Sequence, residues 1–146
     1  DEQFTEEKTK ISEEGVINFN SPEIQQKVID KLNDLPTDLT VYFSLGKSDL
    51  EKQAMELLNC TAAMMTLFPE LKILIRGHAD QTGSLSFNQQ LSYTRAQETM
   101  RYLVSRGIDA NRVVLVEGFG SEKPSRLGSS EEVKSYNRRT ELQFAM

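Results

Sequence analysis

An acidic residue and a basic residue lie one helix apart in this chain, at positions from which both can face the same small ligand. Asp80 follows an apolar segment, 71–76, that is predicted to be a strand, and Arg95 lies fifteen residues further on. A carboxylate binds an ammonium group, and a guanidinium binds a carboxylate, through charge-assisted hydrogen bonds. The pair therefore predicts a binding site for a zwitterion, with Asp80 facing its ammonium and Arg95 facing its carboxylate.

Both residues also have a simpler interpretation. Within Asp80-Gln81-Thr82-Gly83, the aspartate is suited to accept hydrogen bonds from loop amides. This role is compatible with ligand binding, because one carboxylate has several acceptor positions. Arg95, taken without Asp80, would be interpreted as a solvated surface arginine.

The residues around this pair favour binding over catalysis. His78 is the only histidine, whereas a zinc site needs three or four ligands. We therefore expect a structural histidine whose ring bonds to the loop backbone. No Gly-x-Ser-x-Gly motif is present, and Gly46-Lys47-Ser48 is not a phosphate loop, because position 41 is valine where that motif needs glycine. No enzyme activity, metal or cofactor is expected.

Composition indicates one ordinary soluble domain. The chain has 146 residues, of which 38% are hydrophobic and 27% charged, and its net charge is −5. An acidic balance argues against nucleic acid or an anionic membrane surface as the partner. Asp1-Glu2-Gln3-Phe4 is not a signal peptide, so for an exported protein we expect that the targeting segment has been removed. Cys60, the only cysteine, is expected to be a small buried hydrophobe on a helix.

The periodicity of apolar residues predicts the secondary structure. Strands are expected at 39–43, 71–76, 112–117 and 139–144. One helix is expected to begin at Ser48-Asp49 and to end at Pro69, and another to occupy 86–106 and to end at Gly107. The order βαβαβ-loop-β predicts an α/β (α+β) sandwich, with one mixed sheet covered by helices. The last strand, which a loop connects to the rest, is compatible with either parallel or antiparallel pairing in the sheet.

The chain is expected to have two parts. Residues 1–38 form an N-terminal extension or linker, whose amphipathic helix begins near Ser21-Pro22 and ends at Pro36. Residues 39–146 form the domain.

Within the domain, the helix at 86–106 is expected to carry one wall of the site. A wheel at 100° per residue groups five residues as its core face. These residues are Tyr93, Ala96, Met100, Leu103 and Val104. Asn88, Leu91 and Arg95 share a different stripe, which Phe87 flanks, and the free N–H groups of the helix N-terminus favour an anion nearby. Because this stripe lies off the core face, removal of either charge is expected to change stability little.

Four motifs in order carry a family resemblance. They are Ile75-Arg76-Gly77-His78-Ala79-Asp80-Gln81-Thr82-Gly83; then Asn88, Leu91-Ser92 and Arg95-Ala96; then Gly118-Phe119-Gly120-Ser121-Glu122-Lys123-Pro124; and finally Asn137-Arg138-Arg139. Together they resemble the OmpA-like C-terminal, peptidoglycan-binding domain family over residues 39–146.

This resemblance implies a periplasmic domain that binds the peptide stem of peptidoglycan without covalent attachment. Its diaminopimelate residue would be held by Asp80 through the ammonium and by Arg95 through the carboxylate. The rest of the implied site comprises Asn88 and Leu91 as pocket lining, loop amides around Thr82 and Gly83, and Arg139, which with Asn137 and Arg138 would hold the last strand against the site. The implied role is to tether the outer membrane to the cell wall through an upstream anchor, on the periplasmic side of that membrane.

The chain departs from the family pattern at two positions. Ala79 replaces the usual threonine, and Gly46 stands where some relatives carry an acid, so that no ligand contact is expected from the loop around Gly46. Three other functions remain open. They are a flagellar-stator-type cell-wall anchor, a protein-interaction domain with an inactive pocket, and a wall-active enzyme using His78 and Asp80.

Overall fold

The computed structural model describes residues 22–23, 26, 30 and 39–145. The chain divides into two units, Asp1–Pro36 and Thr37–Met146, and every element discussed below belongs to the second unit. Most of the helix expected between Ser21 and Pro36 lies outside the described residues, and the role of 1–38 stays a prediction. The elements of the second unit are β1 (Leu39–Tyr42), α3 (Lys52–Leu67), β2 (Lys72–Gly77), α4 (Leu85–Ser105), a 3-10 turn (Ala110–Arg112), β3 (Val113–Gly118), α5 (Glu131–Asn137) and β4 (Arg139–Ala145).

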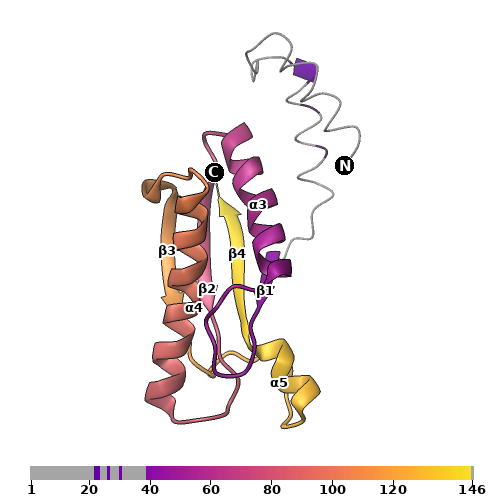
Figure 1. The fold of residues 1–146 in the computed structure, drawn as a ribbon, viewed down its shortest axis with the longest axis vertical. Coiled ribbons are helices and arrows are strands. Elements are labelled where there is room, and N and C mark those ends of the chain that lie inside the picture. The colour runs from indigo at the N-terminus through magenta and orange to yellow at the C-terminus, as the bar shows by residue number, and fades with distance from the viewer. Residues whose placement is uncertain (1–21, 24–25, 27–29, 31–38, 146) are drawn as a thin grey trace. The chain divides into compact units, whose positions relative to one another are not determined.

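The strands form one mixed sheet in the order β1-β4-β2-β3. The neighbours β2 and β3 are parallel, whereas β4 is antiparallel to both β1 and β2. The last strand of the chain therefore inserts into the middle of the sheet rather than adding at an edge (Figure 1). This arrangement confirms the predicted mixed sheet covered by helices.

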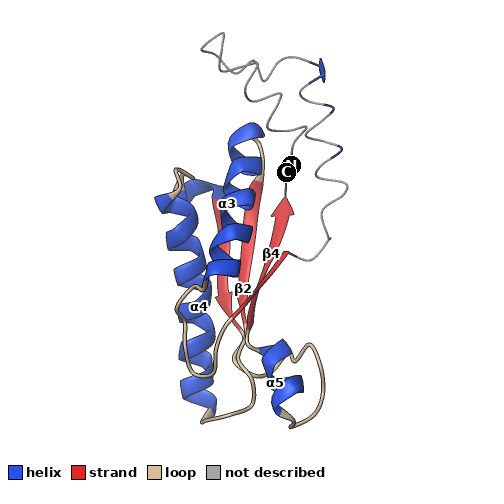
Figure 2. Ribbon diagram, turned by 45° about the vertical axis from the view of Figure 1, so that its right-hand side comes forward, coloured by secondary structure: helices blue, strands red, loops and turns tan. Residues whose placement is uncertain are grey.

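Two helices cover one face of the sheet. The helix α4 packs on β2 and β3, and α3 packs on α4 and β1 (Figures 1 and 2). The strand side chains alternate accordingly, since Ile73 and Ile75 are fully buried under the helices, whereas Lys72 on the other face is exposed. Among the described residues, no helix has both the length and the apolar character needed to cross a lipid bilayer.

Two glycines allow α4 to approach the sheet closely. Gly77 and Gly118 are paired across β2 and β3 at the ends of these strands. A Cβ atom at Gly77 would lie 1.9 Å from the backbone oxygen of Ser92, and one at Gly118 would lie 2.5 Å from the backbone nitrogen of Tyr93. Any side chain at either position would therefore push α4 away from the residues that follow β2.

The buried face of α4 differs from the predicted one. The buried residues are Asn88, Ser92, Arg95, Ala96, Thr99 and Leu103. Tyr93 and Val104, which were assigned to the core, are each 40% exposed. The prediction was right for Ala96 and Leu103 but wrong for Tyr93 and Val104, because the face that meets the glycines carries small and polar side chains.

Three smaller expectations also need correction. The helix α5 occupies part of the segment that was predicted to be a polar loop, and its N-cap is Ser130, whose hydroxyl accepts from the Val133 N–H. The helix α3 begins at Lys52 rather than after Ser48-Asp49. Cys60 lies on α3 as expected, but it is exposed rather than buried.

Candidate functional site

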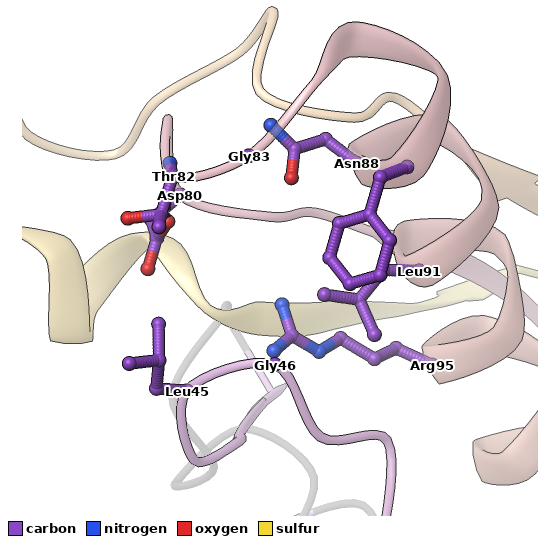
Figure 3. A pocket seen from close by; sticks show the side chains of 9 residues that line it. Leu45, Gly46, Asp80, Thr82, Gly83, Asn88, Leu91 and Arg95 are labelled. Carbon is purple, nitrogen blue, oxygen red and sulfur yellow. Dashed lines mark hydrogen bonds between the residues drawn. The ribbon is translucent and has the colours of Figure 1, made fainter.

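A small pocket lies where the chain leaves the carboxyl ends of β1 and β2, the edge at which open sheets commonly bind ligands. Its volume is about 170 Å³. The lining residues are Leu45, Gly46, Asp80, Thr82, Gly83, Phe87, Asn88, Leu91 and Arg95 (Figure 3). Six of the seven predicted site residues are thus brought together around one cavity. The seventh, Arg139, is not part of its lining.

Asp80 forms the acidic side of the pocket and is 4% exposed. Its Oδ1 accepts a hydrogen bond of 2.7 Å from the Thr82 N–H, which is the turn role considered for it from the sequence. Its Oδ2 lies 3.1 Å from Arg138 Nη1. Burial raises the pKa of Asp80, but the bonds from Thr82 and Arg138 outweigh burial and hold the pKa below its usual value. The carboxylate is therefore charged at neutral pH.

Arg95 is fully buried and is not a surface arginine. Its Nε donates to the Lys47 carbonyl at 2.9 Å, its Nη1 to the His78 carbonyl at 2.9 Å and its Nη2 to the Ser44 carbonyl at 3.1 Å. The guanidinium therefore joins the loop after β1 to the loop after β2. One N–H remains on each terminal nitrogen.

The charge of Arg95 is kept despite burial. Burial lowers the pKa of Arg95 from its ordinary value to about 10, and the charge of Asp80 opposes this fall. The guanidinium carbon also lies 5.1 Å from the ring centre of Phe43, within reach of a cation–π contact. A cation and an anion, both almost free of solvent, therefore face the same small cavity.

Arg138 is the partner that the sequence reasoning did not assign to Asp80. Besides that contact, its Nε donates to the Phe43 carbonyl at 3.1 Å and its Nη2 lies 2.9 Å from Glu131 Oε1. The side chain therefore ties the pocket acid to the end of β1 and to α5. From the sequence, Arg138 was expected only to help hold the last strand against the site, together with Asn137 and Arg139.

The neighbouring residues of the same motif are structural. The Asn137 amide binds the backbone of Ser125 and Arg126 through three hydrogen bonds, which fasten the preceding loop to α5. Arg139 donates to the Lys123 carbonyl at 2.9 Å and to Glu141 Oε2 at 2.8 Å. Arg139 therefore holds the start of β4 in place, as the resemblance implied, but from outside the pocket.

The loop after β1 lines the pocket through Leu45 and Gly46, although no ligand contact was expected from this loop. Leu45 is 54% exposed and Phe87 is 51% exposed, so these two side chains form an apolar rim. Gly83 has φ of +92°, and a Cβ there would lie 3.1 Å from the Phe87 ring. Glycine is thus needed at this turn both for its backbone and for the ring beside it.

His78 is structural, but not through the predicted bond to the loop backbone. Its ring stacks on Phe119 with centroids 5.4 Å apart, and neither ring nitrogen forms a hydrogen bond. Its Nε2 lies 3.4 Å from Glu141 Oε1. Burial and the nearby Arg139 lower the pKa of His78 to about 4. In the part of the chain that the structure describes, no three His, Cys, Asp or Glu side chains gather as a metal site would require.

Acid should destabilise the domain through His78. Its folded pKa of about 4 lies below the ordinary value of 6.5, so the unfolded chain binds the proton first as pH falls. Stability should therefore decrease between pH 6.5 and 4. The neutral variant His78→Gln should show a flatter dependence of melting temperature on pH in this window. Parallel curves for the variant and the parent would contradict this account. Burial raises the pKa of Glu141, but Arg139, with a smaller contribution from His78, holds it below its usual value, so Glu141 adds an acid-dependent loss of stability only at the lower end of this window.

The fold and much of the sequence are similar to those of known proteins. The model of the OmpA family matches residues 42–138, which include the whole pocket. This chain belongs to the OmpA family. The peptidoglycan-associated lipoprotein of Haemophilus influenzae is 35% identical over 105 residues, which are 72% of this chain and 68% of that protein. The protein of the same name from Pasteurella multocida is 34% identical over 105 residues, or 72% of this chain and 69% of its own length.

Solved structures agree with the family assignment. The peptidoglycan-associated lipoprotein from Burkholderia pseudomallei superposes with a TM-score of 0.70 at 30% identity, covering 73% of this chain and 89% of that one. The C-terminal domain of Helicobacter pylori MotB superposes with a TM-score of 0.67 at 23% identity, covering 74% and 84%. The second likeness concerns the fold alone.

Proposed function

We propose that this OmpA-family domain binds the diaminopimelate residue of the peptidoglycan stem peptide and so tethers the outer membrane to the cell wall. The observation that carries the proposal is the juxtaposition of buried Asp80 and buried Arg95 on one cavity of about 170 Å³. The names of the Haemophilus and Pasteurella relatives, peptidoglycan-associated lipoprotein, support the choice of polymer. The family assignment supports association with the cell envelope, and we place the domain on its periplasmic side.

The far end of the diaminopimelate side chain is an amino-acid head with an ammonium and a carboxylate. In the proposed complex, Asp80 accepts hydrogen bonds from the ammonium. The carboxylate takes the N–H groups of Arg95 that are not bound to Lys47, His78 and Ser44. Loop amides around Thr82 and Gly83 complete the polar shell.

The methylene groups of the ligand need an apolar wall. Leu91 and Asn88 supply the helix side of the pocket, and Leu45 and Phe87 supply its exposed rim. Burial of both pocket charges strengthens their attraction for the ligand, because little water screens them. The polar groups that line the pocket can donate or accept hydrogen bonds, and no activated nucleophile lines it. This favours binding without covalent chemistry.

Sedimentation with insoluble peptidoglycan tests the proposal. The parent domain should pellet with diaminopimelate-type wall and should release no soluble muropeptides. The Asp80→Asn variant keeps an oxygen for the Thr82 N–H but loses the charge that faces the ammonium. Its affinity should fall roughly 30-fold or more, since loss of one partner of a buried charge pair costs about 2–5 kcal/mol.

Glu131→Gln provides a matched control. Glu131 also pairs with Arg138, at 2.9 Å, but its side chain is 70% exposed and it does not line the pocket. Exposed ion pairs contribute about 0–1 kcal/mol, so this variant should pellet within about fivefold of the parent. Unchanged pelleting of Asp80→Asn would remove Asp80 from the binding site. Failure of the parent to pellet would favour a protein-interaction domain, and release of fragments would favour an enzyme.

A further inference from the structure

A second hollow lies next to the pocket, on the other side of the loop that follows β1. Its volume is about 300 Å³. The residues that line it are Tyr42, Phe43, Glu51, Ser135 and Tyr136. An adjoining hollow of about 310 Å³ shares Tyr42 and Glu51 and continues along the outer edge of β1 past Thr40. Because the two hollows share residues, we treat them as one groove, which we call the tyrosine groove. Of its lining residues, Phe43 also contacts Arg95 and Arg138 of the site described above.

The aromatic side chains of the tyrosine groove are held in place by their neighbours. The Tyr42 and Tyr136 rings meet edge to face, with centroids 6.3 Å apart and an interplanar angle of 86°. The Arg126 guanidinium lies 3.5 Å above the Tyr136 ring, and Asn137 fixes the backbone of Arg126. Tyr42 is nevertheless 49% exposed. The groove therefore presents a preorganised aromatic surface to solvent.

The polar groups of the groove favour a neutral ligand rich in hydroxyl groups. Around the hollow beside Tyr136 they are the Tyr42 and Tyr136 phenols, the Ser135 hydroxyl and the Glu51 carboxylate, with no basic side chain in the lining. The neighbouring hollow adds one lysine, Lys52. Such a surface does not suit a polyanion, whereas a pyranose ring has apolar C–H faces for an aromatic ring and equatorial hydroxyls for carboxylate and hydroxyl partners.

The tyrosine groove and the pocket are joined by a short piece of backbone. Tyr42 and Phe43 line the groove, whereas Leu45 and Gly46 line the pocket. Consecutive Cα atoms are about 3.8 Å apart, so Tyr42 and Leu45 lie at most roughly 11 Å from each other. In the stem peptide, two residues separate diaminopimelate from the sugar, so that three residue-to-residue steps join them and can span roughly 11 Å when extended. A sugar joined to a peptide in the pocket is therefore within reach of the groove.

We propose that the tyrosine groove binds the glycan strand of the same peptidoglycan whose stem peptide enters the pocket. This inference rests on the proposed function and adds a saccharide site to it. Two adjoining hollows that share Tyr42 and Glu51 offer room for a ligand longer than one sugar. Two linked contacts also raise the effective concentration of each ligand part for its own site.

The test compares two soluble probes, the stem tripeptide that ends in diaminopimelate and the same tripeptide attached to the glycan disaccharide. Titration calorimetry with the parent should give an affinity about tenfold higher for the disaccharide probe. In Tyr42→Ala and in Tyr136→Leu this ratio should fall to within about twofold, while affinity for the tripeptide alone is kept. The ratio is measured within each variant, so partial unfolding does not imitate the effect.

Tyr93→Ala is the matched control, because Tyr93 is 40% exposed on α4 and lines neither the pocket nor the two hollows of the tyrosine groove. This variant should keep the parent ratio. Equal affinity of the parent for both probes, with the tripeptide bound, would overturn the glycan site and leave the proposed function intact. Retention of the full ratio in both tyrosine variants would overturn it as well. Failure of both probes to bind would contradict the proposed function and, with it, this inference.

Discussion

The Arg95→Ala variant should melt on the order of 10–20 °C below the parent and should lose wall binding. Arg95 is fully buried, and its three hydrogen bonds go to carbonyl oxygens in two different loops. Truncation would leave these oxygens without partners and would open a cavity beside Phe43. The expected cost is about 3–5 kcal/mol, and each kcal/mol lowers the melting temperature of a domain of this size by about 4 °C.

Arg101→Ala supplies the comparison. Arg101 lies on the same helix, but its side chain is 70% exposed and its ion pair is with Glu98 one turn away. Its removal should change the free energy of unfolding by less than about 0.5 kcal/mol. Thermal unfolding of both variants, followed by circular dichroism, measures the difference. Equal melting temperatures would mean that Arg95 does not join the loops as described, and would restore the expectation of a surface arginine.

This result would reverse what the sequence led us to expect for Arg95. The helical wheel identified the stripe of Asn88, Leu91 and Arg95, and this stripe does face the pocket. It also predicted that the stripe lies off the core, whereas Asn88 and Arg95 are buried. The helical-wheel rule considers only the apolar side chains of the helix itself. It therefore cannot predict that two loops elsewhere in the chain cover the Arg95 guanidinium and accept its hydrogen bonds.

The positions of the strands and long helices were easier to predict than the burial of Arg95, because these elements give the sequence a regular pattern of apolar residues. The strand at 71–76 is observed at Lys72–Gly77, and the helix at 86–106 at Leu85–Ser105. The helix α5 was missed because its seven residues are too few for a periodic apolar stripe. Ser130 as cap, followed by Glu131 in the first turn, was the signal that could have found it.

The position of β4 could not be predicted from local pattern. Its alternating residues indicated a strand, but its insertion between β1 and β2 depends on pairings with residues far away in the sequence. The same limit applies to the site. Asp80 and Arg138 are 58 positions apart, and the pairing of β4 with β2 brings Arg138 rather than Arg139 to Asp80.

The proposed complex makes a strong prediction about ligand choice. Diaminopimelate and lysine differ at the far end of the side chain, where lysine has an ammonium but no carboxylate. With lysine, Asp80 would keep its partner, whereas the two unused N–H groups of Arg95 would face a cation. A buried charge without its partner loses its charge-assisted bonds, and sites built on such contacts reject the analogue strongly. We therefore expect a stem peptide with diaminopimelate to bind at least about a hundredfold more tightly than the same peptide with lysine, a difference of about 2.7 kcal/mol.

Amidation of the far carboxylate should weaken binding for the same reason, since the amide keeps the size of the group but loses its charge. The ammonium would remain opposite Asp80, so the amidated ligand should bind more weakly than diaminopimelate. Because the three ligands differ only at this end, the comparison isolates the contact with Arg95 from every other part of the pocket.

Calorimetric titration of the purified domain with two stem tripeptides, one ending in diaminopimelate and one ending in lysine, is the most direct test of the central claim, that Asp80 and Arg95 together recognise one amino-acid head. In the tripeptides the near amine is part of a peptide bond, so only diaminopimelate offers a complete amino-acid head. We predict saturable binding of the diaminopimelate tripeptide at one site and no measurable binding of the lysine tripeptide at the same concentrations. Equal affinity for the two tripeptides would contradict the claim, because the ligand carboxylate would then not be held by Arg95.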